Sequence, residues 1–266
     1  MRKSFFFRAV NASEIMTSLF KAKYGFNLMN HKNNYLIKNY LEQSNDLPRT
    51  AVDRVYDDLL RRIVSLELPP GSQLVRGELC SEYKVSQTPV REALLRFEQV
   101  GLVNVKPQSG TEVSYIDIKQ LEQSHFLREA LEFEVVRQLT QMPNEGVVSQ
   151  LREIVAMQEQ VSTADSEDII MFAKLDELFH RSMFSAIGHE SLYKLVRSRS
   201  GHMDRVRRLH LPSEGKIRSV LAGHTAIVDA IESGSQEKAF EAMRDHLAGT
   251  ISRVRILQEE FPEYFC

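Results

Sequence analysis

The spacing of hydrophobic residues divides this chain into an irregular start, a short mixed segment and a long helical remainder. Residues 1–48 combine aromatic, basic and Asn-rich stretches without a sustained period. From residue 50 apolar positions recur at helical spacing until Leu68-Pro-Pro-Gly71 ends the pattern. Beyond residue 116 the pattern stays helical. We therefore predict a mostly α-helical chain in three parts: an extension (1–48), a mixed domain (49–115) and an all-helical domain (116–266).

The mixed domain is predicted to hold three helices followed by two strands. The second helix covers about residues 76–83, and a short break at 84–86 separates it from the third. Alternating residues over 101–105 and 111–115 predict two strands. The turn between them, Lys106-Pro-Gln-Ser-Gly110, is rich in residues that interrupt regular structure. The segment thus has the order of a winged helix-turn-helix.

The third helix is predicted to have a buried face and an exposed face. Thr88 suits the N-cap, and Pro89 suits the first helical position, where its missing N–H costs nothing. The spacing places four apolar residues on the inner face: Val90, Ala93, Leu94 and Phe97. Thr88, Arg91 and Leu95 project from the other side. Arg91 is therefore expected to be exposed near the start of the helix.

The rest of the chain is predicted to be a bundle of amphipathic helices. Their approximate ranges are 118–141, 144–162, 166–187, 190–209, 216–233 and 236–259. Breaks are expected at Pro143-Asn144, Gly188, Leu211-Pro212-Ser213 and Ser233-Gly234-Ser235.

Composition limits the size of the core and the cellular compartment that we expect for this chain. With 266 residues and 42% hydrophobic content, the chain can bury one large core or two small ones. No window approaches the ~18 consecutive apolar residues of a membrane span. The two cysteines, Cys80 and Cys266, fit neither a disulfide framework nor a paired-thiolate metal site, which agrees with a reducing compartment. We expect a cytoplasmic protein.

Charge is uneven along the chain, which has a formal net charge of −2. Residues 1–48 hold seven Lys/Arg and three Asp/Glu (+4), residues 49–115 nine of each (0), and residues 116–266 eighteen and twenty-four (−6). The prediction that the mixed domain binds DNA cannot rest on its net charge and must rest on the positions of its charged residues. The extension reads either as a poorly ordered tail or over-long start, or as a basic arm that touches DNA phosphates.

The mixed domain resembles the DNA-binding domain of GntR-type regulators over about residues 50–115. The run Val85-Ser-Gln-Thr-Pro-Val-Arg-Glu-Ala-Leu94 carries the likeness, together with Phe97, Gly101-Leu-Val103 and the turn Lys106-Pro-Gln-Ser-Gly110. The resemblance implies that the third helix enters the major groove and that the wing approaches the minor groove or the backbone. It also implies a homodimer on a nearly palindromic operator.

Candidate DNA contacts follow from the chemistry of the third helix and the wing. Arg91 can donate two hydrogen bonds to guanine O6 and N7, and Thr88 with the free amides of the helix start can bind a phosphate. Gly110 lets the wing backbone approach DNA closely. The full candidate set is Arg91, Thr88, Gln87, Ser86, Arg76, Lys106 and Gly110.

Two positions depart from the pattern of GntR-type regulators. Gln87 and Gly77 stand where such regulators usually carry arginines. Gln87 can still read adenine through N6 and N7, so we expect an altered operator preference rather than lost binding. Arg76, and Arg54, Arg61 and Arg62 on the first helix, either supply phosphate contacts instead or form a solvated helix face.

The helical domain contains a candidate metal site. Asp176 and His180 lie four residues apart, hence on one helix face, and His224 and His246 each lie within an apolar helical stripe. A lone histidine in such a stripe is more often a hydrogen-bonded core residue. One aspartate and three neutral imidazoles together suit Zn²⁺ or Ni²⁺, with Mn²⁺ as a further candidate, and leave positions for water or a carboxylate.

The helical domain is similar to the FCD sensor domain of the FadR-like GntR regulators over about residues 118–258. The likeness lies in the spacing of the metal candidates and in Phe126-Leu-Arg-Glu-Ala-Leu-Glu132. It implies that Asp176, His180, His224 and His246 are metal ligands. It also makes Arg128 a candidate for binding an acidic effector, although an ion pair with Glu132 at i+4 explains the arginine almost as well.

These observations predict a repressor of a catabolic operon that is released by a small carboxylate or sugar acid bound at the metal. One alternative is a metal-dependent hydrolase with Glu177 or Glu132 as base, but an enzyme has no use for the helix and wing. Another keeps the fold and makes the metal purely structural.

Overall fold

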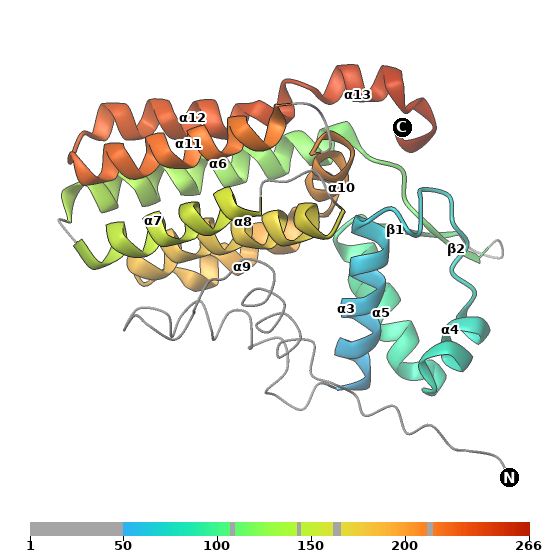
Figure 1. Ribbon diagram of the computed structural model, residues 1–266. Coiled ribbons are helices and arrows are strands. Elements are labelled where there is room, and N and C mark those ends of the chain that lie inside the picture. Colours follow the sequence, from blue (N-terminus) through green and yellow to red (C-terminus); the bar gives the residue numbers. More distant parts are fainter. Residues whose placement is uncertain (1–49, 107–109, 143–144, 162–165, 212–214) are drawn as a thin grey trace, which may run out of the picture. The chain divides into compact units, whose positions relative to one another are not determined.

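The computed structural model describes residues 50–106, 110–142, 145–161, 166–211 and 215–266, without the side chains of residues 166–168. The predicted extension (1–48) and the central residues of the predicted wing turn (107–109) lie outside this description. Three helices and two strands come first (Figure 1). They are α3 (Ala51–Val64), α4 (Arg76–Tyr83), α5 (Gln87–Gln99), β1 (Val103–Lys106) and β2 (Gly110–Val113), in the predicted order.

Helix α3 starts at a capping box. The Asp53 backbone N–H donates to Thr50 Oγ1 over 3.1 Å, and the Thr50 N–H donates to the Asp53 carboxylate over 3.3 Å. Inside the domain, Tyr56 of α3 stacks on Phe97 of α5 with ring centroids 4.3 Å apart. The predicted inner face of the third helix is confirmed, since four residues of α5 are buried: Val90, Ala93, Leu94 and Phe97.

The predicted start of α5 is wrong by two residues. The helix begins at Gln87, and Ser86 in extended conformation occupies the N-cap, although its side chain makes no capping hydrogen bond. Thr88 and Pro89 therefore lie inside the first turn. Proline is tolerated there because the first N–H groups of a helix have no partner within it. Arg91 and Leu95 are exposed, as predicted.

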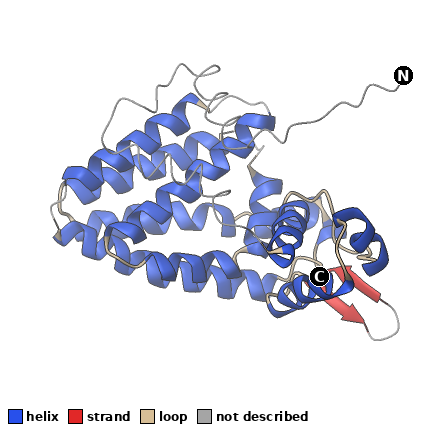
Figure 2. Ribbon diagram, turned by 90° about the horizontal axis from the view of Figure 1, so that it is seen from below, coloured by secondary structure: helices blue, strands red, loops and turns tan. Residues whose placement is uncertain are grey.

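The wing is a two-stranded antiparallel sheet, and it is the only sheet among the described residues (Figure 2). Val103 pairs with Val113, and Lys106 pairs with Gly110 at the far end. Gly110 has φ of +99°, a conformation that residues with a side chain rarely adopt.

The remaining helices form the predicted bundle, but two predicted helices are each divided. The observed helices are α6 (Ile118–Gln141), α7 (Glu145–Gln160), α8 (Ser166–Ala186), α9 (Glu190–Arg199), α10 (Gly201–His210), α11 (Lys216–Glu232), α12 (Gln236–Ile251) and α13 (Val254–Glu260), followed by a 3₁₀ turn, Pro262–Tyr264. Helix α12 packs against α6 and α11, and α7 packs against α8 and α11. Among the described residues, no helix has both the length and the apolar content needed to cross a bilayer.

Both divisions occur without a proline. The predicted helix 190–209 ends at Arg199, and Ser200 turns the chain so that α10 can start at Gly201. A Cβ on Gly201 would lie 2.6 Å from Leu102 Cδ1, so glycine allows α10 to approach the segment before the wing closely. The predicted helix 236–259 ends at Ile251, and α13 follows after Ser252 and Arg253.

Helix α10 holds the segment that leads from the wing into the bundle. Buried Arg205 donates to the Ser114 carbonyl over 2.6 Å. His202 Nδ1 accepts from the Asp117 N–H over 3.1 Å, and its Nε2 lies 3.2 Å from the Gly101 carbonyl, to which it donates. Burial first, and then Arg205, lower the pKa of His202 to about 4. The neutral ring therefore fixes the junction through both of its nitrogens.

Candidate functional site

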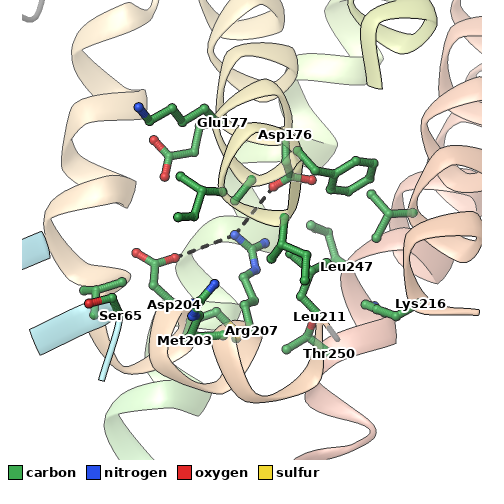
Figure 3. Close-up of a pocket in the computed structure, with 18 of the residues that line it drawn as sticks. Ser65, Asp176, Glu177, Met203, Asp204, Arg207, Leu211, Lys216, Leu247 and Thr250 are labelled. Atoms are coloured by element: carbon green, nitrogen blue, oxygen red, sulfur yellow. Dashed lines mark ion pairs between the residues drawn. The ribbon is translucent and has the colours of Figure 1, made fainter. Parts of the chain in front are cut away.

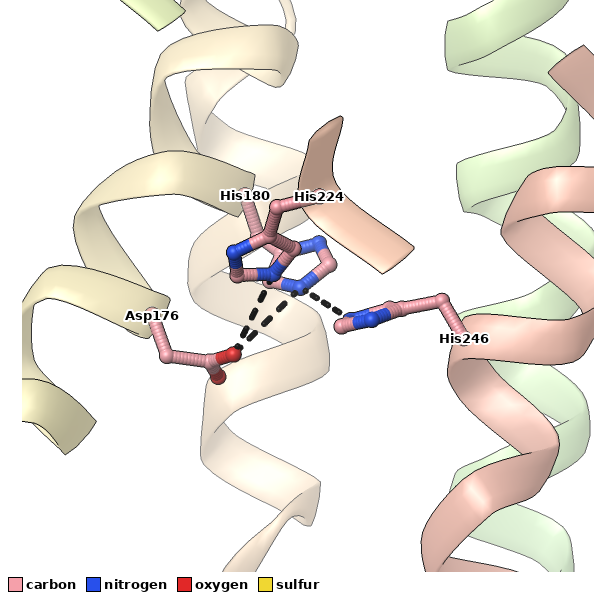
Figure 4. A group of neighbouring side chains, drawn as sticks. All are labelled: Asp176, His180, His224 and His246. Carbon is pink, nitrogen blue, oxygen red and sulfur yellow. Dashed lines mark hydrogen bonds and ion pairs between the residues drawn. The ribbon is translucent and has the colours of Figure 1, made fainter. Parts of the chain in front are cut away.

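Three helices bring the four predicted metal-binding side chains together. Asp176 and His180 come from successive turns of α8, His224 from α11 and His246 from α12 (Figure 4). One ligand atom of each lies within 4.8 Å of those of the others. His180 and His224 are buried, and Asp176 and His246 are partly exposed. The predicted convergence therefore occurs.

The distances within the cluster suit one small cation. The His180 Nε2 and His246 Nε2 atoms lie 3.1 Å apart, and Asp176 Oδ1 lies 3.4 Å from His224 Nε2. His180 Nε2 is 4.0 Å from Asp176 Oδ1. Two tetrahedral ligands about 2.0–2.1 Å from one zinc ion lie about 3.4 Å apart, so little movement is needed to surround such an ion.

Neighbouring oxygen atoms orient two of the imidazole rings. His180 Nδ1 lies 2.5 Å from Glu132 Oε2, and His224 Nδ1 lies 2.7 Å from Gln158 Oε1. Since both oxygens are acceptors, each ring donates from Nδ1 and keeps a lone pair on Nε2. His224 Nε2 is buried and makes no hydrogen bond within the described residues. A metal ligand needs a free lone pair that points towards the other ligand atoms, and this buried nitrogen has one.

Electrostatics also favour the ligand forms of these groups. Burial lowers the pKa of His224, and it lowers that of His246 well below the ordinary value, so both imidazoles are neutral. Burial opposes ionisation of Asp176. The pKa of this carboxyl nevertheless lies below its usual range, and the cationic Arg128 is among the groups that hold it there. The aspartate is therefore an anion beside neutral imidazoles.

Arg128 makes the i+4 ion pair with Glu132 that the sequence offered as the alternative to effector binding, Nε to Oε1 at 2.5 Å, and both residues are buried. Glu132 thus joins Arg128 to His180. Burial alone would raise the pKa of this carboxyl, but Arg128 and His180 lower it to about 2. The charge of Arg128 is balanced within the protein.

A cavity of about 390 Å³ opens beside the cluster, and Asp176 and His246 form part of its lining (Figure 3). Arg207 of α10 lies 3.7 Å from Asp176 Oδ2 and 3.7 Å from Asp204 Oδ1. Clefts of this size that combine apolar walls with a few polar groups are typical of small-molecule sites. The arrangement can therefore hold a ligand next to a bound cation.

Sequence reasoning missed three residues that build this site. Gln158 orients His224, and Arg207 lies at the cavity wall. A Cβ on Gly223 would lie 2.9 Å from His246 Nδ1, so glycine on α11 makes room for the histidine of α12. The only signal for Gln158 was a polar residue on the apolar face of the predicted helix 144–162, and nothing in the pattern indicated Gly223.

The predicted DNA-contact residues gather at the start of α5. Ser86, Gln87, Thr88 and Arg91 are all exposed, and so is Arg76 at the start of α4. In the wing, Lys106 is exposed and makes an ion pair with Glu112, Nζ to Oε1 at 2.6 Å. The centre of the wing turn lies outside the described residues. This end of α5 therefore presents an arginine, an amide and two hydroxyls to a partner.

Two of the three alternative arginines on α3, Arg61 and Arg62, are paired within the protein. Arg61 contacts Asp58 and Glu67 at 3.0 Å and 2.8 Å. Arg62 contacts Glu67 and Glu82 at 3.1 Å and 2.9 Å. Their charges are balanced locally, so these two residues are less suited to replace the arginines that the sequence lacks at positions 77 and 87.

Comparison with known proteins settles the family. Residues 51–113 match the family described as "Bacterial regulatory proteins, gntR family", and residues 123–249 match the FCD domain. A regulator from Streptomyces ambofaciens, "Uncharacterized HTH-type transcriptional regulator in unstable DNA locus", is 35% identical over 217 residues, which are 82% of this chain and 90% of that protein. The chain is a GntR-family transcriptional regulator.

Two further proteins extend the comparison of this GntR regulator. The "Probable D-xylose utilization operon transcriptional repressor" of Paenarthrobacter nicotinovorans is 29% identical over 206 residues, covering 77% of this chain and 89% of that protein. The solved structure of Escherichia coli McbR/YncC covers 80% of this chain and 99% of that chain, with a TM-score of 0.62 and 22% identity, and shares the fold. The gntR family and the relatives from Streptomyces ambofaciens and Paenarthrobacter nicotinovorans are transcriptional regulators and not enzymes.

Proposed function

We propose that this GntR regulator binds operator DNA as a homodimer and represses a catabolic operon. In this proposal residues 50–115 bind DNA and residues 116–266 dimerise and bind the effector. The relative described as "Probable D-xylose utilization operon transcriptional repressor" supports this role. A regulator of chromosomal operators works in the cytoplasm, where we expect this chain.

The exposed Arg91 in the first turns of α5 is the observation that carries the DNA-binding proposal. In the major groove it would donate to guanine, while Gln87 would read adenine. Ser86, Thr88 and Arg76 would contact phosphates, and the wing would approach DNA at Lys106 and Gly110.

Replacement of Arg91 tests this assignment. Arg91→Ala should weaken binding to DNA from the regulator's own promoter by about 1–3 kcal/mol, roughly 5-fold to 150-fold, because one bidentate base contact is lost. Fluorescence anisotropy with labelled promoter DNA measures the affinity. Arg255→Ala, which removes the same charge from an exposed position on α13, is the control. Equal losses for the two variants would contradict a base contact by Arg91.

We further propose that Asp176, His180, His224 and His246 hold a divalent cation, with zinc favoured and nickel or manganese as the other candidates. The support is the buried, unpaired Nε2 of His224 and the distances among the donors. Such a cation supplies positive charge that attracts an acidic ligand. Metal analysis of the purified chain tests its identity. Chelation distinguishes the roles: lost helix content indicates a structural ion, and an intact fold that no longer responds to effector indicates a sensory one.

The effector in this proposal is an organic acid, either a small carboxylate or a sugar acid, that lies in the cavity beside the cluster. Its binding would favour an arrangement in which two recognition helices no longer match the operator, so operator affinity would fall. Titrating a panel of such acids into an operator gel-shift assay tests the proposal. Release of DNA by at least one acid is expected, and an intact complex with every acid would count against it.

A further inference from the structure

The walls of the cavity beside the metal-ligand cluster are mostly apolar. Five elements contribute aliphatic or aromatic side chains to them: α3, α8, α10 with its C-cap, α11 and α12. These residues include Val64, Phe172, Met203, Leu211, Val220 and Leu247. A ligand that fills this space gains by burying its own apolar surface there. The walls therefore favour a ligand with an apolar body.

The polar lining residues are mostly charged, and the neutral polar ones among the described lining residues are Ser65, His125, His246 and Thr250. Among the described lining residues there is no asparagine or glutamine. Two of the three lining carboxylates already bind arginine: Arg197 contacts Glu177 over 2.8 Å and Asp204 over 3.0 Å. The third, Asp176, belongs to the cluster. Sugar hydroxyls buried here would lose water without enough replacement hydrogen bonds, at a cost in binding free energy.

The charges of the lining favour an anion. Six lining residues are Lys or Arg (Arg61, Arg128, Lys174, Arg207, Arg208 and Lys216) and three are Asp or Glu (Asp176, Glu177 and Asp204), a difference of three positive charges. Arg61 and Arg128 are balanced by carboxylates, as described above, and Arg207 is shared between Asp176 and Asp204. The cations differ, therefore, in how available they are to a ligand.

Lys216 is an available cation beside the apolar walls. It is the first residue of α11, it is partly buried, and within the described residues no carboxylate forms an ion pair with its ammonium group (Figure 3). Burial lowers the pKa of this lysine. A desolvated ammonium without a partner is stabilised strongly by an incoming carboxylate.

We propose that the cavity binds a carboxylic acid with an apolar body, whose carboxylate contacts Lys216 while its body fills the space among α8, α10, α11 and the end of α3. The inference rests on the proposed function in placing the effector in this cavity, and it selects apolar acids over sugar acids. Lys216 takes the anchoring role that the sequence suggested for Arg128.

The ligand in this arrangement touches the DNA-binding domain itself. Val64 and Ser65, at the end of α3, belong to the cavity lining. Helix α3 packs against α5, the helix that carries Arg91. A bound acid therefore acts on the recognition helix through one intervening helix, which gives the effector a short route to the DNA-contact surface.

Calorimetric titration of the full chain with four matched probes tests the ligand class. The probes are octanoate, butyrate, gluconate and octanol, so that chain length, hydroxylation and charge vary in turn. Octanoate should bind at least about tenfold more tightly than butyrate or gluconate, because more apolar surface is buried. Octanol should bind more weakly than octanoate, because it brings no anion. Gluconate binding as tightly as octanoate would overturn the proposal.

Variants at position 216 test the anchor. Lys216→Met should weaken octanoate binding about tenfold or more, since a hydrogen bond to a charged group is lost, whereas Lys216→Arg should retain most of the affinity. Lys194→Met, at a position of α9 with a side chain that is 74% exposed, is the matched control and should bind like the unmodified chain. Wild-type affinity in Lys216→Met would overturn the role of Lys216.

Circular dichroism of each variant separates loss of the anchor from loss of fold. If Lys216→Met is misfolded, Val64→Phe provides the second test, because a larger side chain at the cavity wall should exclude octanoate while the carboxylate anchor stays in place. Unchanged octanoate binding in Val64→Phe would contradict the position of the apolar body. Release of operator DNA by gluconate but not by octanoate would overturn this inference and leave the proposed function intact.

Discussion

Single hydrogen bonds determine which nitrogen two of the three histidines of the cluster present. Glu132 and Gln158 accept from the Nδ1 atoms of His180 and His224, which directs both Nε2 lone pairs towards Asp176 and His246. Outer partners of this kind fix ring orientation and make the imidazole a better ligand. The metal affinity of the site should therefore depend on residues that never touch the ion.

Replacing Gln158 tests this dependence. Gln158→Leu should lower metal affinity about 10-fold to 100-fold, because His224 loses the acceptor that orients it. The fold should persist, since Gln158 Nε2 is buried without a hydrogen-bond partner among the described residues and leucine removes that unsatisfied group. Competition with a chelating dye measures the affinity. The control is Gln150→Leu, on the same helix, where the glutamine donates a hydrogen bond to Ser182 instead. A Gln158→Leu variant that binds metal as tightly as this control would refute the orienting role of Gln158.

His202 should make the stability of the regulator depend on pH. Its pKa is about 4 in the folded state, below the ordinary value of 6.5, so the unfolded chain takes up a proton first as the pH falls. Protonation of the unfolded state favours unfolding, and stability falls from about pH 6.5 to about pH 4. Between pH 7 and pH 5 the loss due to this group should be roughly 2 kcal/mol.

Urea denaturation at the two pH values measures this loss. His202→Gln should show a smaller drop in the free energy of unfolding between pH 7 and pH 5 than the unmodified chain. His189→Gln, at the exposed N-cap of α9, should keep the full drop. A His202→Gln variant with an undiminished drop would show that the junction histidine is not the group that titrates.

At the scale of elements, periodicity was sufficient to place the helical segments and both strands of the described residues approximately. Amphipathic spacing and Gly or Pro breaks fixed the order, and the range of α6 was predicted to the residue. The division between α9 and α10 was not visible in the sequence, because it depends on the close approach of Gly201 to Leu102. The start of α5 was misplaced because Ser86 and Thr88 are both suitable N-cap residues.

The metal-ligand cluster was predictable for a different reason. Asp176 and His180 share one helix face, and His224 and His246 each interrupt an apolar stripe, so their residue types stood out in their helices. The cavity was not predictable, since its walls come from helices that are far apart in sequence. Lys216 and Arg207 had no local pattern that distinguished them from surface residues.

The contact between α11 and α12 should be sensitive to a single methyl group. In Gly223→Ala the new Cβ would lie 2.9 Å from His246 Nδ1 and 3.2 Å from its Cβ, so the ring or the helix must shift. Metal affinity should fall by at least about tenfold, as expected when a ligand loses its orientation. Competition with a chelating dye again measures it.

Gly77→Ala is the matched control for this substitution. Gly77 lies in α4, is exposed, and has nothing within 4 Å of the position of a new Cβ. Alanine should leave metal affinity unchanged and stabilise the chain by up to about 1 kcal/mol through its higher helix propensity. If Gly223→Ala and Gly77→Ala have the same metal affinity, the space between α11 and α12 accommodates a methyl group without moving His246.

At the scale of the whole molecule, the regulator combines a DNA-binding segment without net charge and an acidic helical domain. In the proposed function, sequence-specific binding comes from the few exposed groups at the start of α5 rather than from an overall positive charge. Helix α10 contacts the junction through Arg205 and His202, and it borders the cavity through Met203 and Arg207. Binding of the ligand should therefore change the affinity for DNA, and binding of DNA the affinity for the ligand, through α10.

The affinity of the full chain for its promoter DNA, measured by anisotropy with and without saturating octanoate, tests this coupling most directly. The account predicts that the acid weakens DNA binding by roughly 5-fold to 150-fold, the usual range of a coupling free energy of about 1–3 kcal/mol. Lys216→Met should lose this response at the same octanoate concentration. A wild-type affinity for DNA that is the same with and without the acid would contradict the account.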